Sequence, residues 1–175
     1  MEKLRLVIPE EKIKKRIKEL AEAIERDYPE GPLVVIGTLK GAFIFLADLV
    51  RALKRKEVEI DFIRVKSYGY SDVSSENVII TKDIEISISG KPVILVEDII
   101  DTGITLDFLR KHLSLHKPRD LKICAFINKL ERRKVEVPID YVGFTLEKGF
   151  LVGYGLDYAE KFRHLPAIYE VIKNE

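Results

Sequence analysis

The sequence predicts an α/β fold, with a parallel central sheet flanked by helices and a small hood or flap. Short, almost wholly apolar runs that suit buried strands alternate along the chain with longer segments of helical periodicity. No repeat, low-complexity tract or Pro/Gly/Ser-rich linker interrupts this alternation, so residues 1–175 are predicted to form a single domain. Apolar residues make up 46% of the chain, which is enough for a sizeable core.

The first half of the chain alternates helix and strand. Residues 9–28 carry apolar side chains at steps of three and four, which predicts an amphipathic helix beginning near Pro9. Residues 33–37 and 58–69 are predicted strands, and residues 41–56 form a helix with two apolar stripes. One sheet cannot easily cover both stripes, so this helix is either deeply buried or in contact with another subunit. A homodimer or homotetramer would supply that contact.

A flexible flap is expected around residues 67–90. Residues 70–77 are polar and turn-like, and residues 78–82 and 83–88 follow as strand-like segments, the second with clean alternation. They precede the apolar strand at 93–97, so they are interpreted as an antiparallel insertion before the central strand.

The second half of the chain continues the alternation. A helix is predicted at 105–116, strands at 121–127 and 139–146, and a short helix at 166–174. Ligands of parallel sheets bind beyond the carboxyl ends of the strands. The loops after residues 37, 65, 96, 127 and 146 are therefore the positions where a site is expected.

Composition excludes several classes of protein. The net charge is +1, so no global excess of charge points to nucleic acid or membrane. Cys124 is the only cysteine, which rules out an intrachain disulfide and a cysteine-based metal site. Neither a signal peptide nor a run of about 20 apolar residues is visible, and a cytoplasmic location is expected.

The stretch VILVEDIIDTGITL, residues 93–106, combines clustered acids with small residues that suit anion binding. A loop from a buried strand into a helix can offer backbone N–H groups and hydroxyls to a phosphate. Carboxylates suit sugar hydroxyls or a divalent cation. A phosphorylated sugar accounts for both halves, whereas an ordinary N-capped helix does not explain the two acids at the strand end. The acids are Glu97, Asp98 and Asp101, and the small residues are Thr102, Gly103 and Thr105.

This stretch resembles the phosphoribosyl-pyrophosphate signature of the type I phosphoribosyltransferases, a Glu-Asp pair followed by Asp-Thr-Gly-x-Thr. Three further segments, TLKGAFIFLADL, DFIRVKSYG and FLVGYGLDYAEKFRHL, are similar to the hypoxanthine (or hypoxanthine-guanine) phosphoribosyltransferases and stand in the family's order. The resemblance runs from about residue 33 to 166. It implies a purine salvage enzyme that uses Mg²⁺ to transfer 5-phosphoribosyl from phosphoribosyl pyrophosphate to hypoxanthine and guanine, giving IMP or GMP and pyrophosphate.

The resemblance also implies roles for single residues in the signature. Glu97 and Asp98 match residues that contact the ribose hydroxyls, and Asp101 matches the general acid/base near the purine. The loop for the 5′-phosphate comprises Asp101, Thr102, Gly103, Ile104 and Thr105. Asp157 matches a magnesium ligand, and Glu97 and Asp98 are further candidates for metal contact.

The resemblance also implies roles for residues outside the 5′-phosphate loop. Leu39, Lys40 and Gly41 match a pyrophosphate loop that often holds a cis peptide, and Arg163 matches an arginine on pyrophosphate. Lys129 matches the donor to the purine 6-oxo group, Phe150 the aromatic that stacks on the purine, and Leu151 a residue whose backbone reads the base edge. Ser67 and Tyr68 match the mobile lid over the reacting centre.

Some alternatives stay open at this point. A xanthine- or guanine-selective enzyme of the same fold, or a regulator that binds phosphoribosyl pyrophosphate, would share the signature. The basic run 129–134 is expected, beyond Lys129, to lie on the surface or at a subunit contact. His112 and His116 lie one turn apart and could bind a metal, although a solvated helix face also explains them.

Overall fold

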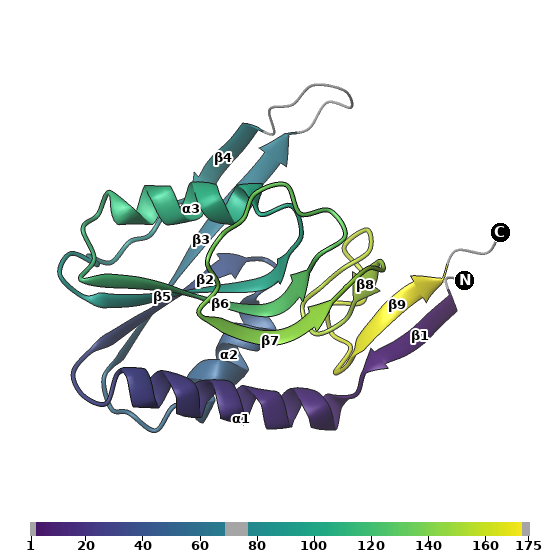
Figure 1. Ribbon diagram of the computed structural model, residues 1–175, viewed down its shortest axis with the longest axis horizontal. Coiled ribbons are helices and arrows are strands. Elements are labelled where there is room, and N and C mark those ends of the chain that lie inside the picture. Colours follow the sequence, from purple (N-terminus) through teal and green to yellow (C-terminus); the bar gives the residue numbers. More distant parts are fainter. Residues whose placement is uncertain (1–2, 69–76, 173–175) are drawn as a thin grey trace.

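A six-stranded sheet forms the centre of the molecule (Figure 1). The computed structural model describes residues 3–68 and 77–172. The strand order is β4-β3-β2-β5-β6-β7, and all neighbours are parallel except β3 and β4. The strands are β2 (Leu33–Leu39), β3 (Val58–Tyr68), β4 (Asn77–Lys82), β5 (Pro92–Ile100), β6 (Asp120–Lys129) and β7 (Tyr141–Leu146).

Helices cover both faces of this sheet, as the apolar strands predicted. Helices α1 (Glu10–Asp27) and α2 (Phe43–Ala52) lie on one face and α3 (Ile104–Ser114) on the other (Figure 1). Alternate residues of β5 supply both layers: Ile94 and Val96 pack in the cluster under α1 and α2, whereas Val93 and Leu95 pack in the cluster under α3. The α/β prediction is confirmed, because strands buried on both faces lack the polar alternation of a half-exposed sheet.

A second, three-stranded sheet lies at one end of the molecule (Figure 1). It is antiparallel, in the order β1 (Lys3–Ile8), β9 (Ile168–Ile172), β8 (Leu151–Val152). The helix predicted at 166–174 is therefore wrong. Its apolar residues are β-branched or aromatic, such as Ile168 and Tyr169, and two neighbouring strands offer them a hydrogen-bonded ladder. No strand had been predicted at β1.

The segment 83–88 is not a strand either, although its residues alternate. Its isoleucines face the cluster under α3, where Ile88 is buried. The backbone N–H groups of Glu85 and Ile86 donate to the same carboxylate oxygen of Asp61, at 2.6 and 3.0 Å. The buried Asp61 side chain thus satisfies backbone N–H groups that a neighbouring strand would otherwise have paired. Residues 83–88 can therefore alternate between buried and exposed side chains without belonging to a sheet.

The two apolar stripes of α2 have different environments. Phe45 and Leu49 are fully buried, whereas Phe43 is 43% exposed. The helix also ends at Ala52, earlier than predicted, because Leu53 has extended backbone dihedral angles. One stripe therefore packs in the core and part of the other faces outward.

The predicted flap is described only in part. β3 and β4 form its antiparallel base, with Tyr68 opposite Asn77. The polar residues 69–76 lie outside the described residues, as do the side chains of Ser67 and Tyr68. Within the described ranges, no helix is both long and apolar enough to cross a membrane.

We predict that Asp61→Asn lowers the free energy of unfolding by about 2 kcal/mol at neutral pH, because charge-assisted hydrogen bonds are lost. Burial opposes ionisation of Asp61, but the N–H groups of Glu85, Ile86 and Phe62 and the Lys82 ammonium hold its pKa below the usual value. A lowered pKa gives stability that is present above the unfolded-state pKa of about 3.9 and is lost as pH falls through the folded-state value.

Denaturant unfolding measured from pH 7 down to pH 3 checks this prediction. The difference between the wild type and Asp61→Asn should shrink as the pH falls. Glu30→Gln, which changes an exposed carboxyl, is the control and should stay close to the wild type throughout. A difference that stays constant or grows in acid would contradict the assigned role of the Asp61 charge.

Candidate active site

Two of the three acids of the signature lie within β5, which extends beyond the strand predicted at 93–97. The strand runs to Ile100, so Glu97 and Asp98 are its members, while Asp101 opens the loop that leads to α3. Gly103 precedes the helix with φ of 85°, which is left-handed backbone that glycine adopts without strain. Residues 97–103, with Thr105 and Leu106, line a pocket at this edge of the sheet.

Of the two neighbouring acids in this region, Glu97 is buried and Asp98 is partly buried. Glu97 is 7% exposed, and the Thr38 hydroxyl donates to its Oε2 at 2.6 Å. Burial raises the pKa of both carboxyl groups; the Asp98 charge raises that of Glu97 further, while Arg163 partly offsets the rise at Asp98. Two neighbouring acids that resist ionisation are suited to a ligand that brings hydroxyl donors or positive charge.

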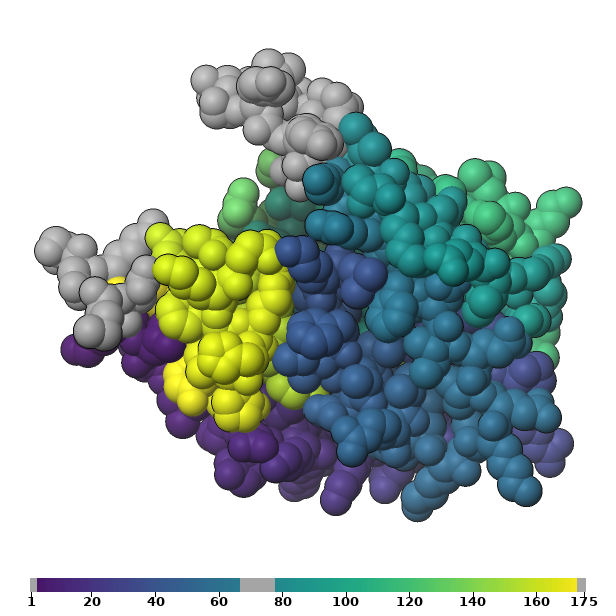
Figure 2. All heavy atoms as spheres, turned by 180° about the vertical axis from the view of Figure 1, so that it is seen from behind, coloured from purple at the N-terminus to yellow at the C-terminus, as the bar shows by residue number. Residues whose placement is uncertain are grey.

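Two glycines let three chain segments meet at Asp98. A Cβ on Gly41 would lie 1.7 Å from Asp98 Oδ2, and a Cβ on Gly155 would lie 2.0 Å from the Gly41 carbonyl oxygen. In the space-filling view the C-terminal segment lies against the region that follows β2 (Figure 2). The peptide bond between Leu39 and Lys40 is cis, as the resemblance implied. The loop after β2 therefore packs against the end of β5, and the segment between β8 (Leu151–Val152) and β9 packs on that loop.

The cationic candidates are paired with acids in this structure. Lys40 Nζ lies 2.5 Å from Glu160 Oε2, and an Arg163 guanidinium nitrogen lies 2.9 Å from Asp157 Oδ1. Arg163 also donates to the Gly155 carbonyl at 2.7 Å, and the Glu160 N–H donates to Asp157 at 2.8 Å. These contacts bring the predicted pyrophosphate and metal residues together along one side of the site.

Lys129 and Asp101 meet on another side. Lys129 is buried at the end of β6, and its Nζ lies 3.8 Å from Asp101 Oδ1. Among the described residues, Asp101 Oδ1 is buried without a hydrogen-bond partner. A buried acceptor of this kind is the place for a donor group of a ligand.

The aromatic candidate, Phe150, lies between β7 and β8. Phe150 is 47% exposed, and its ring meets Tyr158 edge-on with centroids 5.4 Å apart. Leu151 is buried as the first residue of β8. Ser67 and Tyr68 end β3, which β2 separates from β5, so their backbone lies two strands from the acids.

Arg133 is a site residue that the sequence analysis missed, since the basic run was expected beyond Lys129 to be on the surface. Its guanidinium donates to the Asp101 carbonyl at 3.1 Å, to Asn128 Oδ1 at 2.5 Å and to the Lys129 carbonyl at 3.1 Å. One partly buried side chain thus joins the loop after β5 to the loop after β6. A single arginine in a basic run carries no signal for this role.

The backbone of the loop after β6 also forms hydrogen bonds with the loop that is predicted to bind the 5′-phosphate. The N–H groups of Lys134 and Val135 donate to the Thr102 carbonyl at 2.9 and 3.0 Å. A Cβ on Gly103 would lie 2.2 Å from the Val135 carbonyl oxygen. Gly103 is thus required both by its dihedral angles and by this close approach.

Comparisons with known proteins agree with this geometry. A family model described as the phosphoribosyl transferase domain matches residues 8–159. The hypoxanthine-guanine phosphoribosyltransferase of Aquifex aeolicus is 52% identical over 170 residues, which cover 97% of this chain and 95% of that protein. The hypoxanthine phosphoribosyltransferase of Escherichia coli is 44% identical over 169 residues, which cover 95% of this chain and 94% of that protein.

A solved structure shares the fold. A crystal structure of a hypoxanthine-guanine phosphoribosyltransferase from Bacillus anthracis, with a HEPES molecule in the active site, matches with a TM-score of 0.91. It is 49% identical, and the match covers 96% of this chain and 98% of that chain. The fold therefore extends over nearly the whole length of both proteins.

We predict that Arg133→Ala weakens the binding of a nucleoside 5′-monophosphate about tenfold, equivalent to about 1.4 kcal/mol. The reason is that the Arg133 guanidinium, which donates to the carbonyl groups of both Asp101 and Lys129, is removed. Calorimetric titration measures the affinity, with Arg51→Ala, at an exposed position of α2, as the matched control. Equal affinities of Arg133→Ala and Arg51→Ala would show that the loops hold their positions without this side chain.

Proposed function

The chain belongs to the phosphoribosyl transferase domain family, and from that premise we propose that it transfers 5-phosphoribosyl from phosphoribosyl pyrophosphate to hypoxanthine and guanine. The products are IMP or GMP and pyrophosphate, so the enzyme acts in purine salvage. The observation that carries the proposal is the meeting, at one edge of the sheet, of buried acids, an anion loop and the Lys129–Asp101 pair. Relatives named for this activity cover nearly the whole chain.

The ribose is assigned to Glu97 and Asp98. Their carboxylates accept hydrogen bonds from the 2′- and 3′-hydroxyls, and their charge faces the positive charge that develops on the ribose ring during transfer. The Thr38 hydroxyl, 2.6 Å from Glu97, orients that carboxylate. The raised pKa values of the pair support this assignment, since hydroxyl donors replace the protons that burial favours.

The 5′-phosphate is assigned to the turn between β5 and α3. Thr102, Gly103, Ile104 and Thr105 offer N–H groups and hydroxyls at the start of the helix, where the helix dipole favours an anion. The Thr102 hydroxyl accepts the Ile104 N–H at 3.3 Å, which holds the turn in shape. None of these four residues has an acidic side chain that would repel a phosphate. The carboxylate of Asp101, the first residue of the loop, is assigned to the purine.

Pyrophosphate is assigned to the loop at Leu39, Lys40 and Gly41, together with Arg163. Lys40 and Arg163 are held by Glu160 and Asp157. A pyrophosphate would exchange these carboxylates for phosphate oxygens, which likewise accept charge-assisted hydrogen bonds from the guanidinium and ammonium groups.

Magnesium is assigned to Asp157, with Glu97 and Asp98 as the other candidates. The residues fit the ion, because Mg²⁺ prefers oxygen ligands and the Asp157 charge adds to the raised pKa of Asp98. When bound, Mg²⁺ neutralises the negative charge that builds on the departing pyrophosphate. A release of Arg163 from Asp157 would free that carboxylate for the ion.

The purine is assigned to Lys129, Asp101, Phe150 and Leu151. Lys129 donates to the 6-oxo group, and the adenine amino group, itself a donor, would leave this ammonium unsatisfied. Asp101 accepts the ring proton as the glycosidic bond forms, and its Oδ1 lacks a hydrogen-bond partner among the described residues. The exposed ring of Phe150 supplies a stacking face, and the Leu151 backbone reads the base edge.

Three expectations complete the proposal. Ser67 and Tyr68 belong to a lid that keeps water from the reacting ribose. The outward stripe of α2, with Phe43 exposed, suits a contact in a homodimer or homotetramer. The enzyme acts in the cytoplasm on small molecules.

The proposal is tested by supplying hypoxanthine, guanine, xanthine and adenine in competition, each with phosphoribosyl pyrophosphate and Mg²⁺, and measuring the nucleotides formed. Hypoxanthine and guanine should be consumed, adenine should not, and removal of Mg²⁺ with a chelator should abolish turnover. Consumption of xanthine alone or of guanine alone would indicate the selective enzymes of the same fold. Absence of turnover with all four bases would refute the enzymatic function.

We predict that Asp101→Asn lowers kcat by about 10²- to 10⁴-fold, the usual contribution of a general acid/base. Its effect on the affinity for phosphoribosyl pyrophosphate should be much smaller. Steady-state kinetics and calorimetry separate the two effects. Asp107→Asn is the matched control, because its carboxylate pairs with Lys111 on α3. Equal losses in kcat and in affinity would argue against proton transfer by Asp101.

A further inference from the structure

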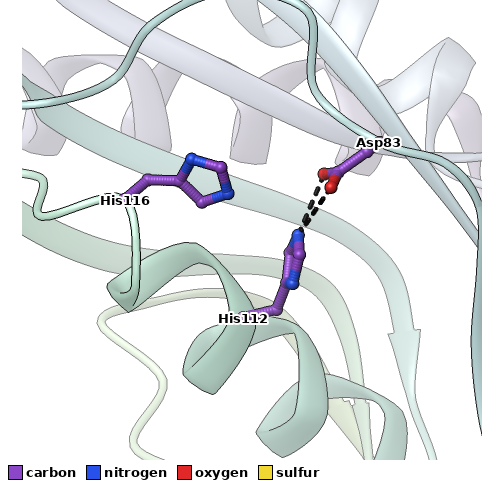
Figure 3. Close-up of side chains that lie close together, drawn as sticks. All are labelled: Asp83, His112 and His116. Carbon is purple, nitrogen blue, oxygen red and sulfur yellow. Dashed lines mark hydrogen bonds and ion pairs between the residues drawn. The ribbon is translucent and has the colours of Figure 1, made fainter.

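Outside the active site, Asp83, His112 and His116 gather at the far end of α3 (Figure 3). His112 belongs to the last turn of α3, His116 lies two residues beyond its end, and Asp83 directly follows β4. One ligand atom from each of the three lies within 4.8 Å of the other two. The cluster therefore joins side chains from two segments that are far apart in the sequence.

The geometry of the cluster is close to that of a metal site. His112 Nε2 lies 3.0 and 2.9 Å from the two carboxylate oxygens of Asp83. Figure 3 shows the His116 ring with one nitrogen facing this pair. Bonds of about 2.0 Å to a tetrahedral ion put neighbouring ligand atoms roughly 3.4 Å apart. Closing the remaining gap requires rotation of His116, which is exposed and meets the His112 ring edge-on with centroids 5.4 Å apart.

Two of the three ligands are held in place by their neighbours. The His112 ring stacks on Phe108, one turn earlier on α3, with the planes 7° apart. The Ile84 N–H donates to Asp83 Oδ1 at 2.8 Å. Partners of this kind orient metal ligands and reduce the ordering that binding requires.

We propose that Asp83, His112 and His116 bind a divalent transition metal, with Zn²⁺ as the best fit. Two imidazole nitrogens and one carboxylate are a ligand set for zinc, and a water completes the four positions. Imidazole suits zinc, copper and nickel, whereas Mg²⁺ prefers oxygen ligands alone. This site is therefore chemically distinct from the magnesium-binding acids assigned at the active site.

A bound metal would tether two elements that both lead to the active site. Helix α3 begins at Ile104, in the phosphate loop, and the ion would fix its opposite end. Asp83 lies at the foot of the β3–β4 hairpin that forms the base of the flap. An ion bound only in the folded state stabilises that state in proportion to the logarithm of its concentration.

The test begins with metal-free protein and Zn²⁺ as the probe. Calorimetry should show one ion per chain with a Kd below about 10 µM, and the melting temperature should rise with each tenfold increase in Zn²⁺. His116→Asn and Asp83→Asn should each weaken Zn²⁺ binding at least tenfold and remove most of the shift in melting temperature. His164→Asn is the matched control, since His164 is exposed and outside the cluster, and it should bind Zn²⁺ as the wild type does.

Several results would overturn the proposal. The first is Zn²⁺ binding weaker than about 10 µM, which would leave only the hydrogen-bonded contact between Asp83 and His112. Equal losses of Zn²⁺ affinity in His164→Asn and His116→Asn would indicate binding without a defined site. Zn²⁺ binding without a rise in melting temperature would refute the idea that the ion links α3 to the β3–β4 hairpin. A Mg²⁺ titration should give the same shift in wild type and His116→Asn, and a difference between them would contradict the zinc preference. Melting of each metal-free variant verifies that it is folded.

Discussion

The contact between Gly41 and the Asp98 carboxylate is the constraint on which the rest of the site depends. A Cβ at Gly41 would lie 1.7 Å from Asp98 Oδ2, so any side chain there would displace the carboxylate. Gly155 packs in turn on the Gly41 carbonyl, where its own Cβ would lie at 2.0 Å. The C-terminal segment is therefore in backbone contact with the loop after β2, and that loop is in contact with the Asp98 carboxylate at the end of β5.

The sequence predicted the parts of this arrangement that depend on local pattern. The apolar runs predicted the parallel strands, and the Glu97–Asp98 pair with the following glycine and threonines predicted a phosphorylated sugar at the end of one of them. Where the sequence analysis failed, tertiary contacts had overridden local pattern. Segment 83–88 alternates like a strand, but Asp61 satisfies two of its N–H groups, and Ile168–Ile172 forms a strand because β1 and β8 lie on either side of it.

Arg133 illustrates why part of the site could not be predicted. Its role depends on the carbonyl of Asp101, the amide oxygen of Asn128 and the carbonyl of Lys129, and two of these three acceptors are backbone atoms. Backbone acceptors leave no mark on the sequence, so a basic run gives no indication of which member is buried. The spacing of residues in the sequence could indicate which side chains contact a ligand. The side chains that position those residues could be identified only from the three-dimensional arrangement of the loops.

Charge pairing explains how the site remains stable before substrates arrive. Lys40 and Arg163 are paired with Glu160 and Asp157, whereas burial favours the protonated forms of Glu97 and Asp98. A substrate with hydroxyls, phosphates and an accompanying cation supplies a partner for each of these groups, so pairs within the protein are exchanged for pairs with the ligand. Since Lys40 and Arg163 would be paired both before and after this exchange, it avoids the large desolvation cost that an uncompensated charge would impose. Under the proposed assignment, a phosphorylated sugar is expected to bind better than a simple anion, because an anion alone would leave Glu97 and Asp98 without hydrogen-bond donors.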